Sequence, residues 1–398
     1  MFSHIRPLTQ NSQNYTLNLF DYPLWWVTCS LDLVLYTGDI DYAKTYYPSL
    51  IFLLEHYYSW NTNTSSGLLS KGIKANSAGY GDYAFIPRTG EVTYYNALYV
   101  AALRAGAQLS EIVDRQDSYA RRWTERADLV ADAINKKLWD EEAGAYINSP
   151  QDASTTFGQD GNSLAVLHGI APASRATKAL AYLDTFHRQP YGNVFFNNDV
   201  LGQNFSKRVY GFTSYFEISA RFVAGQADSA IEEIKRLYGW MATHDPGITM
   251  WEGIGPTGSQ YEGPYTSDAH GWSTGVLPAL SNYVLGVMPT GPGFKTFTVK
   301  PYTPANVTWA QGQVPTPYGH ISVKWLKDES GFHMNVTTPK GTEATVSVPV
   351  RSPDDRASVN GATAWYRREG VMRDAAYSNG WVSIAVAGGF SYTFDVWH

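Results

Sequence analysis

Several residue types that mark common protein classes are scarce in this chain of 398 residues. It has a single cysteine, Cys29, so a disulfide within the chain is impossible. Charged residues make up only 17% of the sequence, and the basic ones are scattered, which gives no electrostatic footprint for nucleic acid. No apolar run reaches the roughly 18 residues that cross a bilayer. We therefore expect neither nucleic acid nor a membrane as partner.

Sequence motifs that hold cofactors are also missing. The chain has no nucleotide-binding loop, no His or Cys cluster with metal-ligand spacing, and no heptad run, so we expect no cofactor and no metal. The start "MFSHIRPLTQ" lacks the apolar region of a signal peptide, which favours a cytoplasmic protein. Asn-x-Ser/Thr sequons favour a secreted lineage instead, and they stand at Asn14, Asn63, Asn204, Asn306 and Asn335. The location stays open between the two.

The chain is rich in apolar and aromatic residues. Hydrophobic residues make up 44% of it, which predicts a sizeable core and two domains. Aromatic residues make up 15%, with 13 Trp and 28 Tyr. Most of these rings serve a core. Many nevertheless stand beside Gly, Asn and Asp in loops, a composition that suits stacking on sugar rings. A carbohydrate or another small molecule is therefore the expected ligand.

Helical patterns fill the first 290 residues. In "YPLWWVTCSLDLVLY", apolar residues recur at helical spacing, and Cys29 among them is predicted to be an inert buried thiol. Further helices are predicted at 42–58, 92–109, 118–138, 160–168, 173–186, 209–224, 226–243 and 270–285. Aromatic, small-residue helices alternate with helices that are charged on one side. This alternation predicts a mainly α fold, an (α/α) toroid of helical hairpins. A generic bundle is the alternative, although long Gly/Tyr/Asn loops favour the toroid.

The pattern changes near residue 290. The segments "HISVKWLKD", "GFHMNVTT", "EATVSVPV", "WVSIAVAGG" and "YTFDVWH" alternate apolar and polar residues and are separated by turn residues. We therefore predict two domains, an (α/α) barrel-like domain at 1–290 and an antiparallel β-sandwich at 291–398.

Acidic residues in loops are the candidates for chemistry. Glu252 follows Trp251, and a carboxylate beside an indole is partly desolvated, which suits a general base. A surface Glu in a Gly-rich loop is the plainer interpretation. His270 starts the helix "HGWSTGVLPALSNYVLG", and a neutral His is favoured there. Tyr261 and Trp272 belong to the same Gly-rich segment and are counted as candidate substrate contacts.

Other acidic residues have less support. Asp82, in "SAGYGDYAFIPRTGEV", and Glu91 ahead of a helix are candidate catalytic residues. Asp160 most simply caps a helix. Glu217, inside "SYFEIS", is either buried and paired or reaches the central cleft as a substrate contact.

The ordered motifs "DYPLWWV", "YTGD", "GDY", "NALY", "LWDEEAGAY", "QDGNSLAV", "FTSYFEISARFVAG", "WEG" and "HGWSTGVLPALSNYVLGVMP" resemble those of fungal α-L-rhamnosidases and related six-hairpin glycosidases. The similarity covers about residues 20–300, and the C-terminal segment resembles the β-sandwich that follows the barrel in that family. The resemblance implies a six-hairpin toroid and an inverting α-L-rhamnosidase.

The resemblance also implies roles for residues. Trp251-Glu252 matches the family's Trp-Glu, whose Glu is the general base, and His270 matches a sugar-hydroxyl contact. Gly81-Asp82-Tyr83 matches an Asp-Trp-Gly segment, with Tyr83 where Trp is usual, so that stacking there is altered. Glu91 matches a Gly-Glu pair ahead of the next inner helix.

One part of the family pattern is not found. The general acid of the family lies in an Arg-rich acidic segment before "DYPLW", and no carboxylate precedes Asp21 here. Asp82, Glu91, Asp160, Glu217 and Glu262 are the possible substitutes. The predicted helices also number fewer than the twelve of a closed six-hairpin barrel. We therefore expect reduced hydrolysis and an open, incomplete toroid whose apolar flank a second copy covers.

Two alternatives stay open. In the first, the toroid is repurposed and binds or transforms a hydrophobic small molecule without hydrolysis. In the second, the chain is a subunit that completes a partner chain.

Overall fold

The computed structural model describes residues 19–74, 86, 88–114, 118–151, 155–201, 205–244, 247 and 249–397. Asp82 and Tyr83, two of the predicted site residues, lie outside these ranges. The chain forms two compact units. Unit 1 comprises Met1–Leu31, Asp41–Ala224 and Glu232–Gly275, and unit 2 comprises Asp32–Ile40, Gly225–Ile231 and Val276–His398.

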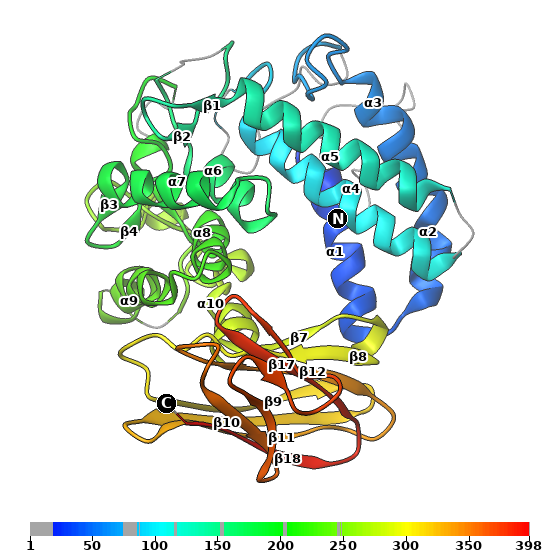
Figure 1. The fold of residues 1–398 in the computed structure, drawn as a ribbon. Coiled ribbons are helices and arrows are strands. Elements are labelled where there is room, and N and C mark those ends of the chain that lie inside the picture. Colours follow the sequence, from blue (N-terminus) through cyan, green and yellow to red (C-terminus); the bar gives the residue numbers. More distant parts are fainter. Residues whose placement is uncertain are drawn as a thin grey trace. The chain divides into compact units, whose positions relative to one another are not determined.

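Helices of unit 1 follow one another as hairpins (Figure 1). They are α1 (Tyr22–Thr37), α2 (Ile40–Phe52) with the π-helix Leu53–Tyr57 and α3 (Tyr58–Trp60), α4 (Thr93–Val113), α5 (Tyr119–Lys137), α6 (Gln159–Leu167), α7 (Ala173–Phe186), α8 (Gly211–Val223) and α9 (Ala227–Thr243). The end of α1 and the start of α9 belong to unit 2. The predicted helix ranges up to residue 243 are confirmed to within a few residues. The prediction of one helix at 270–285 is wrong, because that range divides into a 3-10 turn (Gly271–Ser273), the short helix α10 (Val276–Ala279) and a π-helix (Leu280–Val284).

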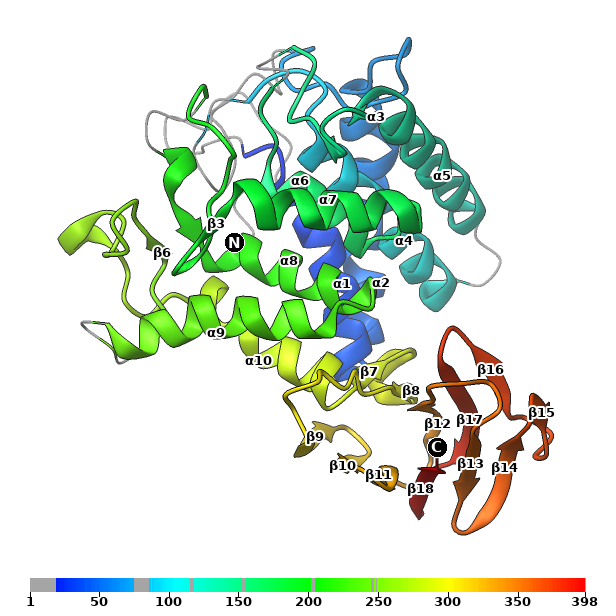
Figure 2. The same cartoon turned by 60° about the vertical axis from the view of Figure 1, so that its left-hand side comes forward.

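Inner and outer helices differ in burial, as the alternating composition predicted. Side chains on nearly every side of α4 are buried, whereas α5 buries one face around Trp123. Helix α4 packs on α5 and α6, and α6 packs in turn on α7 and α8 (Figures 1 and 2). Gly106 lets α4 approach the π-helix and α5 closely, because a Cβ there would lie 2.6 Å from Leu54 and 3.1 Å from Trp123.

Short strands tie the loops of unit 1 to the helix starts. Two of these hairpins are β1 (Trp139–Asp140) with β2 (Ala145–Tyr146), and β3 (Arg188–Gln189) with β4 (Gly192–Asn193). More important for the site, β5 (Val209–Tyr210) pairs with β6 (Gly253–Ile254). This pairing fixes the Gly-rich segment that follows Trp251 against the first turn of α8. The sequence pattern did not predict it, because each strand has only two residues.

Unit 2 contains two sheets that form the predicted β-sandwich (Figure 2). The larger has the order β15-β14-β13-β18-β11-β10-β9 and the smaller the order β16-β17-β12-β8-β7. The strands are β7 (Val287–Pro289), β8 (Thr296–Val299), β9 (Trp309–Thr316), β10 (Gly319–Asp328), β11 (Gly331–Thr337), β12 (Glu343–Pro349), β13 (Arg356–Val359), β14 (Ala362–Tyr366), β15 (Glu369–Gly370), β16 (Ala376–Ser378), β17 (Trp381–Ala387) and β18 (Ser391–Trp397). Pairing is antiparallel except between β8 and β12.

The core of the sandwich comes from the alternation in its strands. Val323 and Trp325 of β10 and Met334 of β11 are buried, and so are Val346 of β12 and Ile384 of β17. All five strands predicted from alternation are present. The sheet begins at Val287, slightly ahead of the predicted boundary at 290, and the boundary itself stays a proposal.

The prediction for Cys29 is wrong, because its side chain is exposed. Helix α1 buries Leu24, Val27, Leu31 and Val34, which share one face, and Cys29 lies off that face. The apolar residues around it misled the interpretation. None of the described helices combines the length and apolar character needed to span a membrane.

Candidate functional site

The first turns of α1, α4 and α6 meet within unit 1. The Tyr94 hydroxyl, at the start of α4, donates to the Asp21 carboxylate just before α1 at 2.8 Å. The Trp25 indole N–H of α1 donates to the same hydroxyl at 2.9 Å. Ahead of α4, Arg88 pairs with Asp160 in the first turn of α6 at 2.9 Å. Buried polar contacts therefore hold the N-terminal ends of the inner helices together.

The Arg88–Asp160 ion pair is the most enclosed of these contacts. The side chain of Arg88 is 0% exposed and that of Asp160 is 1% exposed. The guanidinium lies 4.9–5.8 Å from ring centroids of Tyr94, Tyr95, Phe195 and Phe196. Asp160 also accepts the backbone N–H of Gly161 at 2.6 Å. The prediction that Asp160 caps the helix is wrong, because it lies inside the first turn of α6, whose cap is Gly158 and has no side-chain cap hydrogen bond. Sequence reasoning missed Arg88, because an Arg in a loop gives no periodic signal.

Glu252 lies at the edge of the β5–β6 pair with part of its carboxylate open to solvent. Its side chain is 17% exposed, and His270 Nδ1 lies 3.9 Å from Oε2. The backbone N–H of Ser267 points to the same oxygen at 3.3 Å. The Trp272 indole N–H donates to the backbone carbonyl of Glu252 at 3.3 Å. The predicted base and the His-Gly-Trp triplet are thus brought into contact.

Tyr261 joins this group from the same Gly-rich segment. Burial raises the pKa of Tyr261, and the charge and hydrogen bonding of Glu252 raise that pKa further. Arg208 lies 4.6 Å from the ring centroid and pairs with Glu262 at 2.6 Å. Tyr261 therefore keeps its proton and can donate a hydrogen bond to Glu252 or to a ligand. Ser267 and Arg208 were not among the predicted site residues.

Aromatic rings continue the group toward α1 and α8. The ring centroids of His270 and Trp272 lie 4.5 Å apart, and the Trp272 ring stacks on that of Phe212 at a centroid distance of 5.2 Å. Phe212 contacts Trp25 edge to face at 5.6 Å, and Trp25 stacks on Phe216 at 4.9 Å. Trp25, Phe212 and Trp272 are half-buried, so this aromatic wall retains surface that a ligand can contact. The role of Phe212 was missed, although "GFTSYF" places it at the start of a helix.

Trp251 does not contribute ring surface to a ligand. Its side chain is 0% exposed, so the expectation that it contacts substrate directly is corrected. An indole is large and apolar, and burying it anchors the segment that carries Glu252. Trp251 is thus a positioning residue.

Glu91 occupies a different set of contacts. Asn63 donates to one carboxylate oxygen at 2.8 Å, and Gln151 accepts the backbone N–H at 2.9 Å. The residue is 6% exposed and stands just ahead of α4, as predicted. These contacts are with loop residues rather than with Glu252.

Glu217 is buried and paired, the first of the two alternatives considered for it. Arg221 pairs with it at 2.6 Å, and Gln159 and Asn193 each donate to it at 2.7 Å. It has no exposed surface, so we remove it from the candidate ligand contacts. Burial and the charge of Glu217 raise the pKa of nearby Glu233 to about 7.

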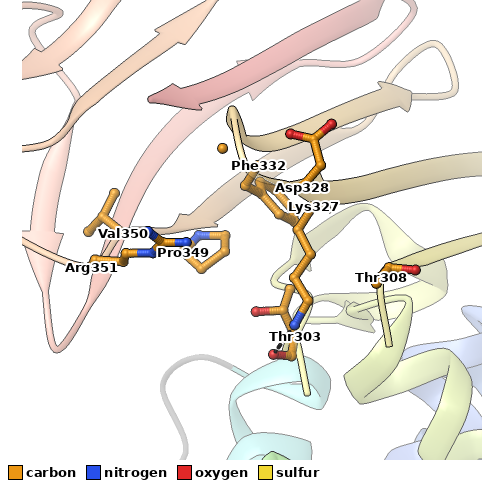
Figure 3. A pocket seen from close by; sticks show the side chains of 9 residues that line it. Thr303, Thr308, Lys327, Asp328, Phe332, Pro349, Val350 and Arg351 are labelled. Atoms are coloured by element: carbon orange, nitrogen blue, oxygen red, sulfur yellow. Dashed lines mark hydrogen bonds between the residues drawn. The ribbon is translucent and has the colours of Figure 1, made fainter. Parts of the chain in front are cut away.

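The described ranges contain no cluster of three His, Cys, Asp or Glu side chains that could hold a metal ion. Two cavities lie away from Glu252, one in unit 2 and one beside Trp60 in unit 1. One, of about 460 Å³, is in unit 2 between the end of β12 and the β10–β11 hairpin (Figure 3). Lys327 points there toward the carbonyl of Thr303, 3.2 Å away, while the carboxylate of Asp328 turns in the opposite direction. None of the predicted site residues lines this cavity.

Comparison with known proteins gives two family matches. Residues 6–190 match the bacterial alpha-L-rhamnosidase 6 hairpin glycosidase domain, and residues 286–363 match the bacterial alpha-L-rhamnosidase C-terminal domain. An alpha-L-rhamnosidase of Alteromonas sp. (strain LOR) is 25% identical over 80% of this chain and 33% of that protein. The chain thus spans about a third of the length of this curated relative.

Solved structures give the same fold. An alpha-L-rhamnosidase from Dictyoglumus thermophilum matches with a TM-score of 0.69 at 17% identity, over 94% of this chain and 39% of that chain. A GH78 family rhamnosidase of Bacillus sp. GL1 matches with a TM-score of 0.65 at 27% identity, over 82% of this chain and 33% of that chain.

Proposed function

We propose that this chain, which has the six-hairpin glycosidase domain and the C-terminal β-sandwich domain of bacterial α-L-rhamnosidases, hydrolyses α-L-rhamnosides with Glu252 as general base. One observation carries the assignment. Glu252 is a partly exposed carboxylate beside His270, Tyr261 and a half-buried aromatic wall. The carboxylates of Asp160 and Glu217, in contrast, are buried against arginines.

The proposed reaction is a single displacement with inversion. A water molecule held by Glu252 attacks the anomeric carbon and gives its proton to the carboxylate while the glycosidic C–O bond breaks. The leaving oxygen takes a proton from a second carboxylic acid, for which Asp82 and Glu91 are the candidates. His270 and Tyr261 hold sugar hydroxyls, and Trp272 covers the ring face. Hydrolysis at the full rate needs both carboxyl groups, because each contributes about 10²–10⁴-fold to the rate.

The test is release of L-rhamnose from 4-nitrophenyl α-L-rhamnoside, whose leaving group needs little protonation. We expect Glu252→Gln to lower kcat by about 10²-fold or more. Glu232→Gln is the control, because Glu232 is an exposed carboxylate on α9 that pairs with Lys235 and is not a candidate for the chemistry. Equal rates for the two variants would reject Glu252 as the base.

The aromatic wall favours a second candidate, binding of a hydrophobic metabolite without hydrolysis. Trp25, Phe212 and Trp272 offer ring surface that does not require a sugar. No measurable hydrolysis by the wild type, together with micromolar binding of an apolar aromatic compound by calorimetry, would favour this function over the first.

The quoted motifs support a likeness to the fungal members in particular. That likeness and the Asn-x-Ser/Thr sequons support a secreted lineage. We further propose that two copies associate through an apolar flank of the helical domain. A monomeric sedimentation profile at high concentration would reject that association, and co-purification of a second, different chain would favour the role of a completing subunit.

A further inference from the structure

An aromatic stripe lies outside the site around Glu252. Its members are Phe52, His56 and Trp60, four residues apart along the helix that ends in α3 (Figure 1). All three are exposed, and Trp60 leaves 54% of its surface to solvent. The Trp60 ring lies 6.1 Å from Phe52 at right angles and 5.8 Å from His56. Neighbouring rings therefore fix the orientation of an exposed indole.

A cavity of about 640 Å³ adjoins this indole. Two of its lining residues, Trp60 and Ile73, are apolar, and the other five carry hydroxyl, amide or ammonium groups, namely Ser59, Thr62, Asn63, Thr64 and Lys74. The Thr62 hydroxyl donates to the carbonyl of Tyr58 at 2.9 Å, which leaves its oxygen free to accept from a ligand. Thr64 is exposed at the rim. The volume falls within the range of small-molecule sites.

One side chain links the same cavity to Glu91, a candidate catalytic residue. Asn63 lines the cavity and donates its side-chain N–H to Glu91 at 2.8 Å. The Asn63 side-chain oxygen accepts the backbone N–H of Ser65 at 3.0 Å, so the amide orientation is fixed from both sides. A ligand in the cavity is therefore one side chain away from Glu91.

The helix geometry at this place is unusual. Leu53–Tyr57 is a π-helix between α2 and α3, and π turns inside α-helices occur frequently at functional sites. Glu55, in this turn, is tied to Arg122 at 3.0 Å, to Trp123 at 2.7 Å and to Arg126 at 2.9 Å. These contacts stabilise the π turn, which sets how the rings of Phe52, His56 and Trp60 are oriented.

We infer that the Trp60 cavity is a second carbohydrate-binding site, which holds a sugar residue of a rhamnose-bearing glycan. The indole stacks on the C–H face of the sugar, and the oxygens of Thr62 and Thr64 contact its hydroxyls. A cavity lined by one ring and by several polar side chains suits a sugar better than a flat apolar molecule, which would leave those polar groups without partners. The choice of a rhamnose-bearing glycan rests on the proposed function.

Affinity electrophoresis in native gels that contain gum arabic, a rhamnose-bearing polysaccharide, tests this site. The Glu252→Gln protein is used so that the polysaccharide stays intact. Removing a stacked ring weakens binding by about fivefold, and we expect that loss when Trp60→Ala is added, with a smaller loss for Trp60→Phe. Trp309→Ala is the matched control, because Trp309 is 63% exposed on the β-sandwich. Thermal unfolding confirms that each variant is folded.

The outcomes separate the two proposals. Retardation that depends on Trp60 supports the second site even if the wild type releases no rhamnose, in which case only the proposed hydrolysis fails. The second site is overturned if the Trp60→Ala and Trp309→Ala proteins are retarded equally. It is also overturned if the Glu252→Gln protein without either change is not retarded at all. Trp60-dependent binding of naringenin without polysaccharide binding would overturn the sugar assignment.

Discussion

The buried Arg88–Asp160 pair allows a quantitative prediction about how the site is held. Asp160→Asn keeps the size of the side chain and an oxygen that can accept from Gly161, but it removes the negative charge beside Arg88. Both partners are at most 1% exposed, so water cannot replace the lost carboxylate. Removing one partner of a buried ion pair costs about 3–5 kcal/mol. The facing rings offset part of this, at about 0.5–2 kcal/mol for a cation over an aromatic face, so we expect a net loss of about 3 kcal/mol.

Urea unfolding followed by circular dichroism at 222 nm measures this loss, because the helices lie mainly in unit 1. Arg88→Met combined with Asp160→Asn removes both charges and should recover at least half of the stability. Glu232→Gln is the control, because its pair with Lys235 is more than half exposed and is worth less than about 1 kcal/mol. A loss below about 1 kcal/mol for Asp160→Asn, or a double variant as unstable as the single one, would refute the reasoning.

Three further predictions concern the site, the buried acids and the sandwich. His270→Ala should raise KM for the aryl rhamnoside about five- to tenfold with little change in kcat, because a hydroxyl contact binds ground and transition states alike; a fall in kcat alone would contradict this. Glu233 has a folded pKa of about 7, above its ordinary value of 4.5, so its stabilising effect is full below pH 4.5 and is lost as pH rises to 7. The melting temperature of Glu233→Gln, relative to that of the wild type, should therefore rise as pH goes from 4.5 to 7. If the two melting temperatures change with pH in parallel, the assigned pKa is contradicted. Gly331→Ala should destabilise the sandwich by more than about 2 kcal/mol, because a Cβ there would lie 1.9 Å from the carbonyl oxygen of Val396; an unchanged thermal transition would show that the turn relaxes.

Helix positions could be read from the sequence because periodicity there reflects burial directly. The inner helix α4 is buried on nearly all sides, and its small and aromatic residues indicated this burial. Strands β10, β11, β12, β17 and β18 alternate for the same reason. Strand β9 was missed because its residues alternate only between exposed and half-buried positions, so "WAQGQVPT" lacks a buried apolar face.

Part of the site could be read from the sequence as well. Glu252, His270 and Trp272 lie within 21 residues, and the segment between them returns to place them together. Trp251 was misread, because a residue adjacent to a site loop can point either to the ligand or to the core. Neighbours in sequence do not reveal which direction the side chain takes.

The buried acids show why composition around a carboxylate cannot identify a base. Glu252, Asp160 and Glu217 each stand beside apolar or glycine residues in the sequence. What separates them is the partner that the fold supplies: Arg88, 72 residues before Asp160, Asn193, 24 residues before Glu217, and the peptide N–H of Ser267 for Glu252. Paired guanidinium groups leave Asp160 and Glu217 as structural anions, whereas Glu252 keeps part of its carboxylate open to solvent beside a His and a Tyr. The choice of Glu252 over Asp160 therefore depends on a long-range contact, whereas Glu217 has its guanidinium partner, Arg221, four residues on in the same helix. The Glu252→Gln and Asp160→Asn variants separate the roles of these two carboxylates: the first should lower activity at unchanged stability, and the second should lower stability first.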